Sequence, residues 1–344
     1  MPSKKKNFFS RVKASKSPII IAELGAKYAS ISTIKRMIQE SKICGADIVK
    51  FQTYNAKTIS SKKGFFKVLG KKVSQYEFFK KYELSFSDHK KIDKYCRSLK
   101  LEWTSTPSHN NDVDFLEQFR LPFYKTGSDD LTNIPFLRYL ASKNKPLVIS
   151  TGMSTLKEIN NSVNEIVKMG NEQIILLHCI VSYPSRNCDA NLNAIETLKK
   201  EFGFPVGLSD HTQDDLTSIV ATTMGAKIIE KHFTLDYSLK LADYQASLDP
   251  ANFKKLVERV RAVHTTFGNG KKVVMPIEKQ WRKNARKSIF YAKDIKKDAL
   301  IKEDHLVIRR PGSSLNPNLY DSLIGKRIKK NVKIDQSVKI SDFK

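Results

Sequence analysis

The chain has 344 residues, which is enough for an α/β barrel of about 250 residues and a small appended domain. Apolar residues make up 40% of it, and no uninterrupted apolar run approaches the ~20 residues that a membrane-spanning helix requires. Its 61 basic and 35 acidic residues leave a net charge of +26, which favours anionic ligands, but neither zinc-finger spacing nor an RNA-binding aromatic signature supports a nucleic-acid partner.

The first 17 residues are predicted to form a basic extension. The apolar run that follows, from Pro18 to Leu24, is too short for a signal peptide and lacks a small-residue cleavage pattern. The 4 cysteines are scattered, without the paired spacing of a zinc site or a disulfide framework. We therefore expect a cytoplasmic protein in a reduced compartment, without a membrane partner.

Between residues 18 and 268, short β-prone apolar runs alternate with helical patterns eight times, which predicts the β-α units of a TIM barrel. The predicted strands are Ile19–Glu23, Asp47–Phe51, Leu101–Ser105, Phe123–Thr126, Leu147–Ser150, Ile174–Cys179, Pro205–Ser209 and Ile228–His232. The predicted helices include Ser32–Cys44, Ser87–Leu99, Ile134–Lys143, Leu156–Met169 and Asp214–Met224. The stretch from Tyr54 to Phe86 is longer than an ordinary loop and is expected to be a functional lid or a disordered segment.

The β-α alternation ends after residue 268. Residues 269–285 are expected to be a linker, and residues 286–344, where short β-prone runs take over, a small separate domain. The predicted fold is thus an α/β protein, a (β/α)8 TIM barrel over residues 18–268 with a small β-rich C-terminal domain.

Polar side chains stand at or just after the end of nearly every predicted strand, where the reacting groups of a parallel barrel project. They are Glu23, Lys50, Gln52, Ser105, Thr106, Lys125, Ser128, Asp130, Ser150, Thr151, His178, Ser209, Asp210, His211, Glu230, Lys231 and His232. Two lysines with several hydroxyls could hold a carboxylate and a phosphate. A single strand-end lysine, however, is commonly a solvated rim charge.

Histidines on the last two strands, His211 and His232, could bind a divalent metal, although two protein ligands are fewer than the three usual for a catalytic zinc. His178 is more readily explained as a structural histidine. Glu23 could pair with a neighbouring lysine, or act as a base at the barrel mouth. These residues alone indicate a barrel enzyme with an anionic substrate.

Nine short strings occur in the order found in the sialic acid synthase family, and the chain resembles that family from about Pro18 to Phe343. They are Ile21-Ala22-Glu23-Leu24-Gly25, Gly45-Ala46-Asp47-Ile48-Val49-Lys50-Phe51-Gln52-Thr53, Ser105-Thr106-Pro107, Tyr124-Lys125-Thr126-Gly127-Ser128, Ser150-Thr151-Gly152-Met153-Ser154, Leu177-His178-Cys179, Gly207-Leu208-Ser209-Asp210-His211-Thr212, Glu230-Lys231-His232-Phe233-Thr234 and Ala246-Ser247-Leu248-Asp249-Pro250. Further on, Arg309-Arg310-Pro311-Gly312 and Leu323-Ile324-Gly325-Lys326 resemble the antifreeze-like module of those synthases.

The resemblance implies that phosphoenolpyruvate condenses with an N-acyl amino sugar, such as N-acetylmannosamine or a diacetamido-trideoxy hexose, to give a nine-carbon 2-keto sugar acid. It implies a divalent cation, Mn2+ or Mg2+, on His211 and His232, and catalytic carboxylates at Glu23 and Glu230. The residues implied to hold phosphoenolpyruvate are Lys50, Thr106, Lys125, Ser128, Ser150 and Ser209. Those implied to hold the sugar are Gln52, Asp130, Tyr183 and Asp243.

The resemblance also implies a domain-swapped homodimer. In such a dimer Arg310 would reach from the small domain into the active site of the other subunit and fix the N-acyl group of the sugar.

The chain departs from the family pattern at several places around the acceptor. The family's Asn-His-x-Gly after Gly25 is replaced by Ala26-Lys27-Tyr28-Ala29, and Pro-Gly-Pro-Asp by Lys240-Leu241-Ala242-Asp243. Two alternatives therefore stay open. One is a related condensation of phosphoenolpyruvate with an aldose phosphate, and the other is a non-catalytic barrel that binds carbohydrate or nucleic acid.

Overall fold

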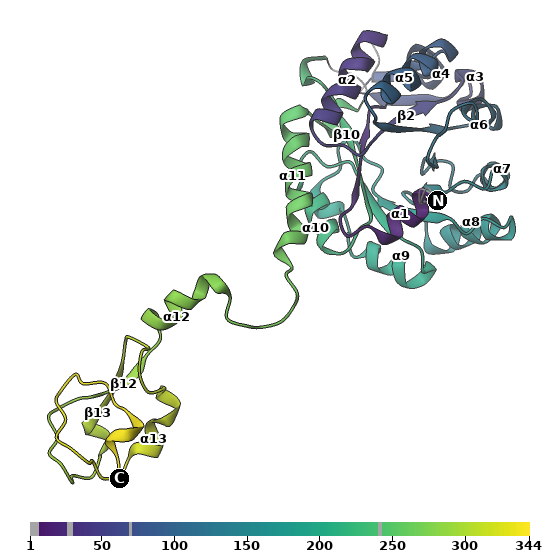
Figure 1. Ribbon diagram of the computed structural model, residues 1–344. Coiled ribbons are helices and arrows are strands. Elements are labelled where there is room, and N and C mark those ends of the chain that lie inside the picture. The colour runs from purple at the N-terminus through teal and green to yellow at the C-terminus, as the bar shows by residue number, and fades with distance from the viewer. Residues whose placement is uncertain (1–6, 26–29, 69–70, 240–242) are drawn as a thin grey trace, which may run out of the picture. The chain divides into compact units, whose positions relative to one another are not determined.

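The computed structural model describes residues 7–25, 30–68, 71–239 and 243–344, and the chain divides into two compact units, Met1–Gly268 and Asn269–Lys344 (Figure 1). The replaced segments Ala26–Ala29 and Lys240–Ala242 lie outside the described residues. Within the described part, no helix combines the length and the apolar character needed to cross a membrane.

The first unit is a parallel barrel in which eight described strands follow the order β5-β2-β1-β10-β9-β8-β7-β6. The strands are β1 (Ile19–Glu23), β2 (Ile48–Thr53), β5 (Glu102–Pro107), β6 (Tyr124–Thr126), β7 (Leu147–Ser150), β8 (Ile174–Cys179), β9 (Val206–Asp210) and β10 (Ile228–Phe233). A short ninth strand, β11 (Ser247–Leu248), pairs with the end of β10. Strands β5 and β6 lie next to each other, so the barrel is nearly closed. The predicted TIM barrel is confirmed.

Helices surround the strands (Figure 1). They are α2 (Ile31–Ile43), α5 (Phe86–Ser98), α6 (Asn110–Leu116), α7 (Ile134–Ser142), α8 (Leu156–Lys168), α9 (Ala194–Phe202), α10 (Leu216–Thr223) and α11 (Pro250–Thr266). Their apolar faces and the outward side chains of the strands form the main hydrophobic core. Local sequence sets the helix starts: Thr155 and Glu158 form a capping box at α8, and the Asp249 side chain caps α11.

The N-terminal segment belongs to the barrel unit, which differs from the expected separate extension over residues 1–17. Helix α1 (Phe8–Ala14) buries Phe8 and Val12 against side chains that fill the barrel at the amino ends of its strands. The ring of Phe8 stacks on that of Phe123 with centroids 4.2 Å apart. Two large apolar residues on one helical face favour burial over a solvated tail, so α1 closes this end of the barrel.

The long segment after Tyr54 contains regular structure. It comprises α3 (Ala56–Ile59), the hairpin β3 (Phe65–Val68) and β4 (Lys71–Ser74), and α4 (Gln75–Tyr82). Aromatic rings join the hairpin to α4, because Phe66 contacts both Phe78 and Phe79 edge to face, with centroids 5.5 and 5.7 Å apart. The described residues of this segment are therefore ordered, and the expected role as a functional lid stays a prediction.

The second unit has its own hydrophobic core, centred on Ile289, Tyr291, Ile328 and Val338. Its regular elements are α12 (Lys279–Ala285), β12 (Ser288–Tyr291), β13 (Leu306–Arg309) and α13 (Tyr320–Leu323), with β12 and β13 antiparallel. Isolated bridges such as Ile295 with Val332 tie the remaining loops together. Helix α12 lies within residues 269–285, which were expected to be a linker.

Replacing Phe8 by Ala should destabilise the barrel unit by about 3 kcal/mol, because a buried ring that stacks on Phe123 would leave a cavity. Urea unfolding followed by far-UV circular dichroism measures this change. Phe9→Ala is the matched control, since Phe9 is only partly buried and should cost much less. Equal midpoints for the two variants would show that α1 does not close the barrel.

Candidate active site

A cavity of about 660 Å³ opens at the carboxyl ends of the barrel strands. The side chains that line it include all but one of the residues proposed for the site from the sequence. They are Glu23, Lys50, Gln52, Thr106, Lys125, Ser128, Asp130, Ser150, Tyr183, Ser209, His211, Glu230, His232 and Asp243. The exception is Arg310, which is exposed and belongs to the second unit.

Strand alternation explains which side chains reach the cavity. Successive side chains of a strand point to opposite faces, so Glu230 and His232 line the cavity while Lys231 between them does not. The register of β1 with β10 and β2 places Glu23 opposite His232 on one side and Lys50 on the other. Residues more than 20 positions apart in sequence therefore meet at one end of the barrel.

The floor of the cavity holds two buried lysines and two buried glutamates. Lys50 forms an ion pair with Glu23, and its Nζ lies 3.7 Å from Glu230 Oε1. It also donates a hydrogen bond of 3.3 Å to Thr106 Oγ1. Each of the four charged residues is at most 5% exposed. Buried charges of this kind persist only when they compensate one another, so the four residues act as one electrostatic unit, here called the charge quartet of Glu23, Lys50, Lys125 and Glu230.

Side-chain hydroxyls form hydrogen bonds with members of the charge quartet. Lys125 donates hydrogen bonds to the Ser150 hydroxyl and, over 2.7 Å, to the Thr126 carbonyl oxygen. Ser209 donates to Glu230 Oε1 over 3.1 Å. Among the residues that the structure describes, Glu230 Oε2 is buried without a hydrogen-bond partner. A ligand hydroxyl or a water molecule would satisfy this oxygen.

The pKa values follow from this arrangement. Burial lowers the pKa of Lys50, but the charges of Glu23 and Glu230 outweigh it and hold the pKa above its usual range. Burial dominates at Lys125, whose pKa falls below its usual range. Burial would raise the pKa of Glu230, yet Lys125 and Lys50 hold it low, so the carboxylate stays ionised. Lys125 is thus the lysine whose charge gains most from an added anion.

His211 and His232 lie together at the same cavity, with ring centroids 5.4 Å apart. Nδ1 of His211 is 2.7 Å from the Ile180 carbonyl oxygen, a bond that leaves its Nε2 as the nitrogen available to a ligand. Burial lowers the pKa of His211, which keeps the imidazole neutral. Two imidazoles that line one cavity fit a divalent cation, although no group of three metal-ligating side chains occurs among the described residues.

The cavity is also lined by the residues expected to hold a sugar. Tyr183 packs against His211 with centroids 4.3 Å apart. Burial, together with the charge of Asp129, raises the pKa of Asp130 to about 6. Asp243 adopts a left-handed backbone, with φ of 59°. Polar groups with this variety of donors and acceptors suit a hydroxylated ligand.

Aromatic side chains that the sequence analysis did not single out form a further wall of the cavity. They are Tyr54, Phe66, Phe78, Phe79 and Tyr82. The rings of Tyr54 and Phe79 meet edge to face at 5.2 Å. The signal in the sequence was the spacing of Phe78, Phe79 and Tyr82, which places three rings on neighbouring positions of one helix.

Several other strand-end residues form internal contacts that stabilise the barrel. Lys231 and Asp210 form a fully buried ion pair of 3.1 Å, and Lys231 also donates to the carbonyl oxygens of Thr212 and Asp214. This pair anchors the loop that carries His211. His178 bonds through Nε2 to the Ala190 carbonyl oxygen at 2.7 Å, in agreement with the structural role expected for it. Ser105 and Thr151 likewise make internal hydrogen bonds.

Comparison with known proteins identifies the family. The model of the NeuB family matches residues 37–272, and the matched region holds most of the cavity-lining side chains. The chain belongs to the NeuB family. An N,N'-diacetyllegionaminic acid synthase of Legionella pneumophila is 38% identical to it over 91% of each chain. An N-acetylneuraminate-9-phosphate synthase of Mus musculus is 32% identical and covers 93% of this chain and 90% of its own.

The fold comparison agrees with this membership. The N-acetylneuraminic acid synthetase of Leptospira borgpetersenii superposes with a TM-score of 0.69 at 29% sequence identity, over 78% of this NeuB-family chain and 91% of its own. The likeness to synthases that the sequence motifs predicted is confirmed at the level of the family.

Replacing Lys231 by Met should cost about 3–5 kcal/mol of stability, because Asp210 would remain buried without its partner. Lys168→Met is the matched control, since Lys168 is mostly exposed where it pairs with Glu165 and should change the stability far less. Chemical unfolding of both variants gives the comparison. Equal stabilities would refute an anchoring role for Lys231.

Proposed function

We propose that this protein condenses phosphoenolpyruvate with an N-acyl amino sugar and releases phosphate and a nine-carbon 2-keto sugar acid. The observation that carries this proposal is the charge quartet with its hydroxyls at the floor of the cavity. Lys50, Lys125, Ser150 and Ser209 offer cationic and hydroxyl donors suited to one carboxylate and one phosphate. The names of the relatives, legionaminic acid synthase and N-acetylneuraminate-9-phosphate synthase, support the same chemistry.

The reaction balances with one water molecule. The methylene carbon of phosphoenolpyruvate forms a bond to the aldehyde carbon of the open-chain sugar, and the aldehyde oxygen takes up a proton. Water adds to the carbon that bears the phosphate and loses a proton, for which Glu23 or Glu230 is the acceptor. The intermediate then expels phosphate and becomes the ketone. Lys50 and Lys125 stabilise the departing negative charge in a site that is poor in water.

A divalent cation on His211 and His232 is part of this proposal. Manganese or magnesium bound there would polarise the aldehyde oxygen of the acceptor. Both imidazoles line the cavity and contact the ring of Tyr183, a residue proposed to hold the sugar, which supports a role for the cation at the acceptor. The bond from His211 to the Ile180 carbonyl fixes the ring that would act as ligand.

The acceptor is proposed to be an uncharged N-acyl sugar, such as N-acetylmannosamine or a diacetamido-trideoxy hexose. Among the described residues that line the cavity, Lys50 and Lys125 are the only lysines or arginines, and both belong to the charge quartet. The aromatic wall suits acyl and methyl groups instead of a second phosphate. This argues against the aldose-phosphate alternative, and the paired quartet argues against a barrel that has lost catalysis.

Arg310 and a domain-swapped homodimer form the remaining part of the proposal, and the resemblance of the motif around Arg310 supports them. An exposed guanidinium offers a rigid fork of donors that suits an amide carbonyl or hydroxyls and that lysine does not reproduce.

An assay of phosphate release tests the function. The protein is incubated with phosphoenolpyruvate, manganese and a panel of N-acyl hexosamines and hexosamine phosphates, and the product mass is measured. We expect phosphate and a nine-carbon acid in equal amounts with an uncharged acceptor. A product from the phosphorylated sugars alone would favour the aldose-phosphate alternative, and no phosphate release with any acceptor would refute the proposal.

Lys125→Ala should raise the Michaelis constant for phosphoenolpyruvate at least about ten-fold, because the loss of a charged hydrogen bond costs about 1.5–3 kcal/mol. Steady-state kinetics measures the effect. Lys145→Ala, which removes a partly exposed lysine paired with Glu117, is the control and should behave like the unmodified protein. Unchanged kinetics in Lys125→Ala would exclude its proposed role.

His211→Ala and His232→Ala should each abolish turnover and weaken Mn2+ binding at least about ten-fold, since each removes one of two protein ligands. Electron paramagnetic resonance of free Mn2+ during a titration reports the binding without relying on activity. His264→Ala, on α11 and outside the cavity, is the control. Full activity of the double variant in the presence of a chelator would end the metal proposal.

Mixing Arg310→Ala subunits with Glu23→Ala subunits should restore part of the activity that each variant lacks, because one hybrid site would contain both intact residues. Subunit exchange is verified with differently tagged chains and native mass spectrometry. If exchange occurs and no activity returns, Arg310 does not act on the partner's site.

A further inference from the structure

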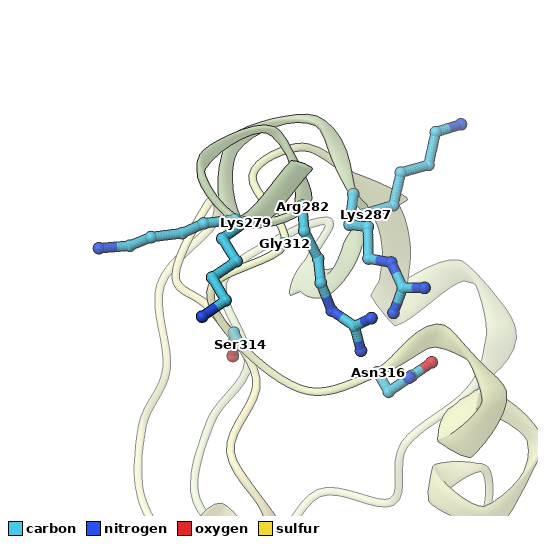
Figure 2. Close-up of a pocket in the computed structure, with 8 residues that line it drawn as sticks. Lys279, Arg282, Lys287, Gly312, Ser314 and Asn316 are labelled. Carbon is cyan, nitrogen blue, oxygen red and sulfur yellow. The ribbon is translucent and has the colours of Figure 1, made fainter. Parts of the chain in front are cut away.

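A second pocket, of about 370 Å³, lies within the small C-terminal unit and is strongly basic (Figure 2). Its walls come from α12, from the two residues that precede β12, and from the loop between β13 and α13. The lining residues are Lys279, Arg282, Lys283, Arg286, Lys287, Gly312, Ser314 and Asn316. Five of these eight side chains are cationic, and none is acidic.

The five cations are not neutralised within the described part of the chain. Other lysines of this unit, such as Lys293, Lys333 and Lys344, form ion pairs with aspartates. No such ion pair involves a described residue that lines this pocket. All five are exposed, so each can turn toward a ligand. The pocket therefore differs from those parts of the unit in which acidic neighbours compensate the lysines.

The spacing of these cations destabilises helix α12. Lys279 and Lys283 stand four residues apart, which places like charges side by side on a helix of seven residues, and Arg282 and the C-cap residue Arg286 add two further cations near its end. A helix of this length is marginal without outside support. An anion bound between these side chains would remove the repulsion, so the helix and the ligand would stabilise each other.

The loop that forms the opposite wall is held at a fixed distance from α12. Gly312 donates its backbone N–H to the Lys283 carbonyl oxygen over 3.0 Å. A Cβ at Gly312 would lie 2.5 Å from the Cβ of Arg286, so only glycine permits this approach. The Ser314 backbone N–H bonds to Ser288 Oγ over 3.0 Å, which fixes the next turn of the loop on β12.

We propose that this pocket is a binding site for a small phosphorylated molecule that carries several adjacent negative charges. Two guanidinium groups provide paired donors that match phosphate oxygens, and three lysines add point charges. The side chains of Ser314 and Asn316 can supply further donors at the edge. The volume is in the range of small-molecule pockets, which favours a compact ligand over a nucleic-acid strand. The described residues that line the site all belong to the second unit, and the proposal does not rest on the proposed reaction.

Pyrophosphate is the probe, and the full chain carrying Lys125→Ala is the starting protein, so that the barrel contributes as little as possible. Isothermal titration at an ionic strength held constant with NaCl should show one saturable site per chain. The variant Lys283→Gln/Lys287→Gln should bind at least about ten-fold more weakly. The matched control Lys296→Gln/Lys297→Gln removes two exposed lysines of the same unit outside the pocket and should change affinity less than about two-fold. Equal losses in both variants would show diffuse attraction and overturn the site.

A second variant distinguishes the effect of the paired guanidinium donors from the effect of positive charge alone. Arg282→Lys keeps the charge of the pocket and should still weaken pyrophosphate binding several-fold, because lysine lacks the paired donors. Unchanged affinity would contradict an arginine-built site. In addition, hydrogen exchange in the α12 amides should slow several-fold when pyrophosphate is added, and not when NaCl of equal ionic strength is added.

Two further outcomes would overturn the proposal. A single-stranded oligonucleotide could bind in a manner sensitive to Lys283→Gln/Lys287→Gln while pyrophosphate does not bind, which would assign the surface to a polyanion strand. Alternatively, the same variant could lose its oligomeric state in sedimentation without any anion binding, which would assign the five cations to an acidic surface of a second copy.

Discussion

The site depends on mutual compensation of charge in a water-poor barrel mouth. Lys50 and Lys125 could not be buried as cations without Glu23 and Glu230, and the glutamates could not be buried as anions without the lysines. The barrel makes this possible because adjacent parallel strands bring residues of distant sequence into register. A substrate anion then enters a site that is already neutral overall, and it competes with the glutamates for the lysines.

This compensation divides the cavity into two regions of different chemistry. The quartet and its hydroxyls occupy the floor, while the aromatic wall from α4 and the hairpin, together with Asp130 and Tyr183, occupies the side. His211 contacts both regions, because its Nε2 lies 3.4 Å from Ser209 Oγ and its ring packs against Tyr183. An enzyme that joins an anionic and a neutral partner needs such a division, because each half must reject the other partner.

The barrel and most of the site were predictable from the sequence. The repeat of apolar runs indicates the strands, and the alternation of side chains along a strand indicates which residues face inward. Apolar runs ending in Lys50 or Ser150 mark strands and strand ends. The same alternation could have separated Glu230 and His232 from Lys231, which points to the framework. The aromatic wall was only partly predictable, since the spacing of Phe78, Phe79 and Tyr82 groups three rings on one helix but does not indicate that they turn toward the barrel. Burial of α1 was missed because seven residues give too little pattern.

The junction between β5 and β6 makes the resistance of the barrel to deformation differ from one side to another. In the part of the chain that the structure describes, these two strands form no hydrogen-bonded ladder, and the Thr104 hydroxyl bridges to the Phe123 carbonyl over 2.8 Å. Every other neighbouring pair of strands is held by regular backbone bonds. The barrel should therefore deform most easily along the one line where two neighbouring strands lack these bonds. That line runs between the strand that contains Thr106 and the strand that carries Lys125, so the direction in which the barrel deforms most easily passes through the floor of the cavity.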